Sequence, residues 1–280
     1  MQVVSAPKKH FFLDHPVTAG TLIVVLYCAV LIGTGSILPA LIPDPSLSGI
    51  AVKAFCILFA AGLAFLVQMA LGKSFTLGLG TKNLGKCLIL GWIPAVTAAF
   101  NIFSNINNFS PAVIASVPMA LLTACYAGLG EEFIYRGIFT NNMMRVLKSR
   151  KNGIYLALTV PAAIFGLSHL INGFAVGFGS ELFIQTAYSV ALGLVFGAMY
   201  LRTRSLLGCI ILHTLIDFCS FIFMRSTGSA DIVSYEVIVA VSVIFLAFLT
   251  IGGTAAAFYM VRKSKHAEIL ANWEMDETEA

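Results

Sequence analysis

"GLGEEFIYRGIF", residues 128–139, places three charged residues, Glu131, Glu132 and Arg136, inside a long apolar segment. A charged side chain is costly in bilayer hydrocarbon, so charged residues of membrane helices face the protein interior and pair with one another. Three of them within six residues therefore indicate a polar site built inside a membrane protein.

The composition of the whole chain supports a membrane protein. Of its 280 residues, 59% are apolar and 11% are charged, and the mean hydropathy is +0.92. These values exclude an ordinary soluble domain. A spanning helix needs about 20 apolar residues, so the chain has room for about eight passes. The six cysteines lie in apolar segments without CxxC spacing, so they predict neither a disulfide framework nor a zinc site.

The hydropathy pattern predicts a single integral membrane domain over residues 1–280. Its polar motifs lie in a core of about 111–224. A cytoplasmic tail follows over about 262–280, and we expect its acidic end, "ANWEMDETEA" (271–280), to be solvated and to fray. The first apolar segment lacks a cleavage site and is expected to be a retained helix. The eight expected spans are 17–42, 49–71, 84–104, 111–140, 153–172, 180–201, 205–224 and 234–261.

The lysines and arginines favour eight spans through the positive-inside rule. With a cytoplasmic N-terminus, only Lys53 and Arg225 lie on the far side, and Arg136 lies within the membrane. We therefore expect a multi-pass protein of the cell membrane with both termini in the cytoplasm. The fourteen residues on the cytoplasmic side are Lys8, Lys9, Lys73, Lys82, Lys86, Arg145, Lys148, Arg150, Lys151, Arg202, Arg204, Arg262, Lys263 and Lys265.

Six ionisable residues are expected within the spans, on three helices. Glu132 and Arg136 are four residues apart, so they share a helix face and can form an ion pair. Glu131 lies about 100° around the helix, so it points elsewhere and is free for chemistry. The other three ionisable residues are His169, His213 and Asp217.

The spacing also predicts that these groups face the bundle interior. His213 and Asp217 are four residues apart, as are Phe165 and His169. At about 1.5 Å per residue, both histidines and Glu131 lie well inside the membrane, so they could meet. A polar cluster that serves only helix packing is the alternative, but six polar groups are more than packing requires.

Three motifs in this region resemble those of a known family. "EEFIYR", "FGLSH" and "HTLID" match, in order, the EExxxR, FxxxH and HxxxN/D motifs of the CPBP family of intramembrane proteases, also called the CAAX prenyl protease 2 or abortive-infection family. The stretch from Gly193 to Asp217, with a GxxxG at Gly193 and Gly197, is also similar to that family. The resemblance covers about residues 127–219. It implies a glutamic endopeptidase whose fold is an all-α polytopic bundle of about eight transmembrane helices around an intramembrane active-site cavity.

The resemblance also implies a role for each motif residue. Glu131 would be the general base that activates water, and His169 would help to hold that water. His213 and Asp217 occupy the positions at which the family stabilises the oxyanion. Three further residues would support the site: Glu132, Arg136 and Phe165.

Asp217 departs from the commonest form of its motif, in which asparagine is frequent, although the family also accepts aspartate. An ionised carboxylate cannot donate a hydrogen bond to an oxyanion. Asp217 would instead orient His213 and leave the imidazole as the donor.

A zinc-dependent protease that uses the same residues is the nearest alternative, because glutamate, aspartate and histidine are all zinc ligands. However, the chain has no HExxH motif and no predicted helix supplies two histidines. We therefore expect no metal and no other cofactor.

Two functions without proteolysis remain open. A proton-coupled carrier would use the buried glutamate and histidines as a relay, although no internal repeat supports a transporter. A membrane scaffold or immunity protein would bind a partner without cutting it. The expected partners are the lipid bilayer and a membrane-associated peptide or protein, prenylated or bacteriocin-like. We expect no nucleic-acid partner, and the sequence leaves the oligomeric state open.

Overall fold

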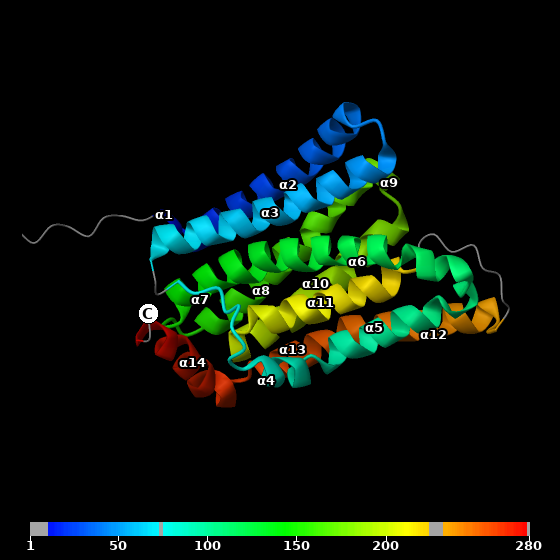
Figure 1. Cartoon of the computed structure of the whole chain (residues 1–280). Helices are drawn as coiled ribbons and strands as arrows, with labels where there is room; N and C mark the ends of the chain where they lie inside the picture. Colours follow the sequence, from blue (N-terminus) through cyan, green and yellow to red (C-terminus); the bar gives the residue numbers. More distant parts are fainter. Residues whose placement is uncertain (1–10, 73–74, 224–231, 279–280) are drawn as a thin grey trace, which may run out of the picture.

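A computed structural model describes residues 11–72, 75–223 and 232–278, and within these ranges every regular element is a helix, as predicted (Figure 1). The α-helices are α1 (Phe11–Asp14), α2 (Pro16–Leu41), α3 (Pro45–Leu71), α4 (Leu84–Leu90), α5 (Trp92–Ser104), α6 (Pro111–Glu131), α7 (Asn141–Leu147), α8 (Gly153–Ser168), α9 (Gly173–Val176), α10 (Ser180–Thr203), α11 (Leu206–Phe221), α12 (Tyr235–Ala247), α13 (Gly253–Met260) and α14 (His266–Thr278). The 3-10 helices are η1 (Ile106–Asn108), η3 (His169–Asn172) and η5 (Lys263–Lys265), and the π-helices are η2 (Glu132–Thr140) and η4 (Phe248–Gly252).

The expected count of eight spanning helices is not confirmed. Among the described residues, six helices are long and apolar enough to cross a membrane, or seven if α4 and α5 together make one span. Those two helices meet at Gly91 with a bend of 59°. In addition, α11 has only 16 residues, about 24 Å of helix, which is shorter than a hydrocarbon core of about 30 Å.

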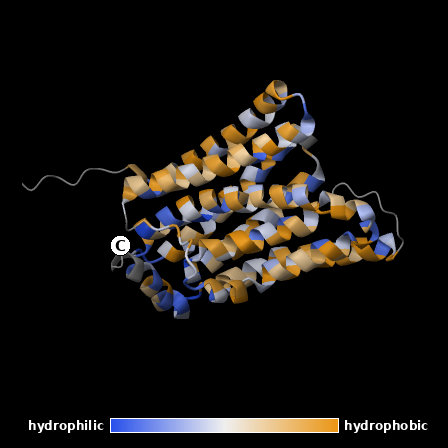
Figure 2. Ribbon diagram, in the orientation of Figure 1, coloured by the Kyte–Doolittle hydropathy of each residue, from blue (hydrophilic) through white to orange (hydrophobic). Residues whose placement is uncertain are grey.

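The two ends of the bundle differ in charge. One end holds α7, α14 and the loop before α4, and we call it the basic end (Figure 1). Figure 2 shows hydrophilic residues gathered on α14, whereas the long helices are mostly hydrophobic. Lys53 lies toward the opposite end, and Lys8, Lys9, Lys73 and Arg225 fall outside the described residues. The eleven described lysines and arginines of the basic end are Lys82, Lys86, Arg145, Lys148, Arg150, Lys151, Arg202, Arg204, Arg262, Lys263 and Lys265.

The basic end is closed by residues 75–79, which run between the helices without helical structure. Phe75 is fully buried, and the Leu206 amide donates a hydrogen bond to the Gly78 carbonyl at 2.9 Å. Gly78 has a φ of 76°, and a Cβ atom there would lie 1.9 Å from the carbonyl oxygen of Arg204. Glycine therefore meets both the backbone angle and the close contact, and this segment ties the adjoining ends of α10 and α11 together.

The helix α14 packs against the bundle as far as Trp273, which corrects the expectation that the chain frays from residue 271 onward. Trp273 of α14 is 1% exposed, and its Nε1 donates a hydrogen bond to the Leu201 carbonyl at 3.0 Å. Glu268 accepts hydrogen bonds from Lys86 and Arg202, which lower the pKa of its carboxyl group to about 2. Helix α14 therefore packs against the basic ends of α4 and α10 and forms ion pairs with both.

Candidate functional site

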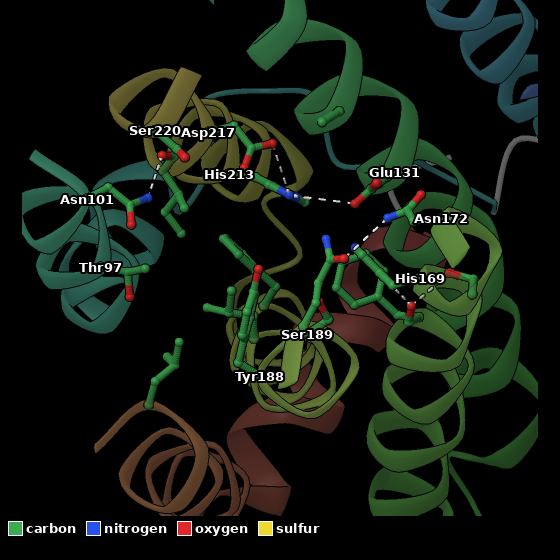
Figure 3. Close-up of a pocket in the computed structure, with 18 of the residues that line it drawn as sticks. Thr97, Asn101, Glu131, His169, Asn172, Tyr188, Ser189, His213, Asp217 and Ser220 are labelled. Atoms are coloured by element: carbon green, nitrogen blue, oxygen red, sulfur yellow. Dashed lines mark hydrogen bonds and ion pairs between the residues drawn. The ribbon is translucent and has the colours of Figure 1, made fainter. Parts of the chain in front are cut away.

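A cavity of about 700 Å³ lies inside the bundle, and α2, α5, α6, α8, α10, α11 and α12 all contribute to its wall (Figure 3). The structure brings all seven residues singled out from the sequence to this region. Two of them, Glu132 and Arg136, are buried behind the wall. The other five line the cavity: Glu131, Phe165, His169, His213 and Asp217.

Glu132 and Arg136 form the ion pair that their spacing predicts, with Nη1 and Oε1 2.8 Å apart. Both side chains are almost completely excluded from solvent. Arg136 Nη2 also donates to the Gly193 carbonyl at 3.2 Å, and its guanidinium group lies over the rings of Phe165 and Phe196. A buried charge is tolerated only when it is paired and hydrogen-bonded, and this arrangement supplies both conditions.

The helix that carries the glutamates changes form between them. Helix α6 ends at Glu131, and the π-helix η2 begins at Glu132; such wider turns are frequent at functional sites. One turn earlier, Gly128 packs against α11, where a Cβ atom would lie 2.9 Å from the backbone nitrogen of Thr214. This close approach brings Glu131 and His213 to the same part of the cavity wall.

Glu131 points into the cavity, as Figure 3 shows. Its side chain is 23% exposed, whereas that of the neighbouring Glu132 is 0% exposed. Glu131 Oε2 lies 3.6 Å from Nε2 of His213, which is too long for a hydrogen bond. The carboxylate is therefore open to a molecule in the cavity.

His213 of α11 connects the buried pair to the cavity. Its Nδ1 lies 2.8 Å from Oε1 of Glu132, and because an ionised carboxylate only accepts, Nδ1 carries the proton. The ring of Phe196 stacks on the imidazole with centroids 5.2 Å apart and planes at 19°. These two contacts fix the ring so that Nε2 faces Glu131 and Asp217 (Figure 3).

Asp217 lies one helical turn beyond His213, and its side chain is 21% exposed to the cavity. Its Oδ2 is 3.7 Å from Nε2 of His213, again longer than a hydrogen bond. The imidazole is oriented instead by the hydrogen bond that its Nδ1 donates to Glu132, a role that the sequence interpretation gave to Asp217. The effect of Asp217 on the imidazole is therefore electrostatic.

His169 begins η3, directly after α8. Its Nδ1 lies 2.9 Å from the Phe165 carbonyl oxygen, which can only accept, so Nδ1 is protonated and Nε2 of the neutral ring is an acceptor. The Phe165 ring meets the rings of His169 and Tyr135 edge-on, each with centroids 4.9 Å apart. The four-residue spacing of Phe165 and His169 thus places both on the cavity wall.

Other residues of the site were not predicted from the sequence. Phe196 packs on both His213 and Arg136 but belongs to none of the three motifs. Tyr135 lies within "EEFIYR", which could have marked it, and its hydroxyl donates to Ser168 Oγ at 2.6 Å. Uncharged polar side chains outside the three motifs also line the cavity and carry no sequence signal of their own: Asn101, Asn172 and Gln185.

The arrangement of potential ligands does not favour the zinc alternative. Within the described ranges, no group of three or more histidine, cysteine, aspartate and glutamate residues is placed to hold a metal ion.

A comparison with protein families matches residues 113–219 to the family described as "Type II CAAX prenyl endopeptidase Rce1-like". This range contains all three motifs and every predicted site residue. The resemblance drawn from the motifs is thereby confirmed over this range, and the match supports a multi-pass membrane endopeptidase of the CAAX type. Neither the curated proteins nor the solved structures include a match to the chain.

Proposed function

From the Rce1-like match of residues 113–219, we propose that this chain is an intramembrane endopeptidase that hydrolyses peptide bonds with a water molecule activated by Glu131. The observation that carries the proposal is the contrast between two adjacent glutamates. Glu132 is enclosed and hydrogen-bonded to Arg136 and His213, whereas Glu131 is 23% exposed and its carboxylate lies 3.6 Å from His213, beyond hydrogen-bonding distance.

Glu131 acts as the general base and then as the general acid. It takes a proton from water as the water oxygen attacks the scissile carbonyl carbon. It then delivers this proton to the amide nitrogen as the carbon–nitrogen bond breaks. His169 accepts the second hydrogen of the water through Nε2, which fixes the direction of attack. A positioned base of this kind contributes about 10²–10⁴ in rate.

His213 donates to the oxyanion that forms during the attack. Because its Nδ1–H is committed to Glu132, the ring can donate through Nε2 only as the imidazolium. Before the attack, Glu131 and Asp217, 3.6 and 3.7 Å from Nε2, stabilise this positive charge in the low-dielectric cavity. Once Glu131 has taken the proton, Asp217 and the oxyanion itself do so. Removal of one oxyanion donor from an active site costs about 10²–10³ in rate.

The proposal includes the membrane arrangement and the class of substrate. The bent pair of α4 and α5 forms one span, and α11 completes eight spans within the bundle, with both termini in the cytoplasm of a cell-membrane protein. The substrate is a membrane-associated peptide or protein, and hydrolysis requires no cofactor, because the chain's own side chains supply the base and the oxyanion donor.

Mass spectrometry of protein termini in membranes tests the proposal. Cells would express equal amounts of wild type, Glu131→Gln and a matched control, Glu181→Gln, whose exposed side chain lies in the first turn of α10. We expect new termini with wild type and Glu181→Gln that disappear with Glu131→Gln. Identical termini in all three samples would contradict the proposal and favour a scaffold or a carrier.

A further inference from the structure

The cavity is not centred between the two ends of the bundle. On α10 its lining residues run from Ile184 to Phe196, and on α11 they run from His213 to Phe221. The remaining residues at the basic ends of these helices, 197–203 and 206–212, do not line it. At 1.5 Å per residue, about 10 Å of each helix therefore separates the candidate site from the basic end.

This separating layer is packed protein. All of residues 197–203 are buried, and the Tyr200 hydroxyl donates to the Leu77 carbonyl at 3.3 Å. Phe75 and Leu206 are also fully buried in the same layer. The closing segment 75–79 thus blocks a path from the basic end to Glu131.

Toward the opposite end, the cavity wall contains uncharged polar side chains among apolar ones such as Ile184 and Phe221. Asn172 precedes α9, Gln185 lies in the second turn of α10, and Ser220 is the last but one residue of α11. Asn101 lies in the last turn of α5 (Figure 3). Amides and hydroxyls both donate and accept hydrogen bonds, as the backbone of an extended peptide requires. Because Asn172 and Ser220 lie at helix ends away from the basic loops, the cavity reaches the end of the bundle opposite those loops.

The distribution of charge identifies which side of the membrane that end faces. Eleven described lysines and arginines lie at the basic end, whereas Lys53 lies toward the opposite end. Such an excess marks the cytoplasmic side of a multi-pass protein. The polar end of the cavity then lies in the non-cytoplasmic half of the bilayer.

We infer that the protease takes its substrate from the non-cytoplasmic side, as a peptide segment held in or at that half of the membrane. This inference rests on the proposed function of the cavity. It selects a membrane-associated peptide that has crossed to the outer side, or an outer-half segment of a membrane protein. A lipid-modified C-terminus on the cytoplasmic surface would meet the packed layer.

The direction of access can be measured independently of catalysis with a membrane-impermeant maleimide applied to intact cells. Gln185→Cys reports on the polar end of the cavity, and Lys151→Cys, in the exposed loop before α8, is the matched cytoplasmic control. The unsubstituted chain gives the background of the six native cysteines, and size-exclusion chromatography in detergent verifies folding. Ser220→Cys replaces Gln185→Cys if that variant does not fold.

We expect Gln185→Cys to react in intact cells at least five-fold above the background, and Lys151→Cys to react only after the membranes are opened. Reaction of Gln185→Cys only after opening, or under neither condition, would overturn the inference. Reaction of Lys151→Cys in intact cells would also overturn it, because the basic end would then face outward.

The topology of the cleavage sites separates this inference from the proposed function. New termini that depend on Glu131 and lie in non-cytoplasmic segments support both. Termini that depend on Glu131 but lie in cytoplasmic segments would overturn the proposed direction of access and would still support proteolysis by this chain. If no termini depend on Glu131, the proposed function fails, and maleimide labelling still decides which way the cavity opens.

Discussion

The half of the bundle at the basic end and the half that holds the cavity differ in how their charged side chains are paired. The boundary between the two halves lies between Glu131 and Glu132. In the basic half, buried charges have direct partners: Arg136 with Glu132, and Arg202 with Glu268. In the cavity half, the carboxylate of Glu131 lies beyond hydrogen-bonding distance of His213.

This difference shows how one motif can serve both stability and chemistry. A charge that stabilises the fold must be satisfied inside the protein, because an unpaired buried charge is strongly destabilising. A charge that acts on a substrate must instead stay open to the cavity. Adjacent positions on a helix point about 100° apart, so two neighbouring glutamates can meet both requirements.

The largest loss of stability is expected from Arg136→Ala. This change leaves the buried Glu132 without its guanidinium partner, which costs about 3–5 kcal/mol in the free energy of unfolding. Chemical denaturation in detergent measures the loss. Arg150→Ala removes an exposed arginine from the loop before α8 and serves as the control, with a change below about 0.5 kcal/mol.

A double variant sharpens this result. Once Arg136 is gone, replacing Glu132 with glutamine removes the stranded charge, so the two losses should not add. Additive losses for the combined Glu132→Gln and Arg136→Ala chain would show that the two residues stabilise the bundle independently.

A smaller loss is expected when the closing segment of the basic half is disturbed. Gly78→Ala forces a Cβ atom into contact with the Arg204 carbonyl at a positive φ, which costs about 1–3 kcal/mol. Gly80→Ala is the matched control, because no atom lies within 4 Å of the Cβ position there. Equal melting temperatures for the two variants would show that the segment does not pack as described.

The smallest effect is expected at the surface of the basic end. Glu268→Gln weakens the contacts with Lys86 and Arg202 and should cost less than about 1 kcal/mol at pH 7, because the carboxyl group is partly exposed. Its pKa is lowered from 4.5 to about 2, so its contribution is fully present above about pH 4.5 and disappears as the pH falls through 2. The difference in unfolding free energy between wild type and Glu268→Gln should therefore shrink between pH 5 and pH 2.

Glu274→Gln, an exposed change on the same helix, provides the control for this pH series. A difference between wild type and Glu268→Gln that stays constant down to pH 2 would contradict the assigned ion pairs.

Local periodicity predicted the parts of the site that lie on one helix. The pairing of Glu132 with Arg136 follows from a spacing of four residues, and so does the shared face of His213 and Asp217. The all-helical fold follows from apolar segments of spanning length, because backbone polar groups inside a bilayer must be satisfied within the segment.

Contacts between distant segments could not be predicted in the same way. The hydrogen bond from His213 to Glu132 joins residues 81 positions apart, and no spacing rule specifies it. The packing of α14 depends on contacts of Trp273 and Glu268 with α10, so its acidic sequence resembled a solvated tail. The buried segment at 75–79 depends on the positive φ of Gly78, which the sequence "LGLG" does not distinguish from an ordinary loop.

The most direct test of the division between the two glutamates is a side-by-side measurement of purified Glu131→Gln and Glu132→Gln. The substrate identified from cellular termini would supply the cleavage rate, and denaturation in detergent the unfolding free energy. We predict that Glu131→Gln lowers the rate by about 10²–10⁴ and keeps the unfolding free energy within about 1 kcal/mol of wild type. We predict that Glu132→Gln lowers the unfolding free energy by several kcal/mol, because Arg136 is left unpaired. Near-normal cleavage by folded Glu131→Gln would contradict the assignment of the general base.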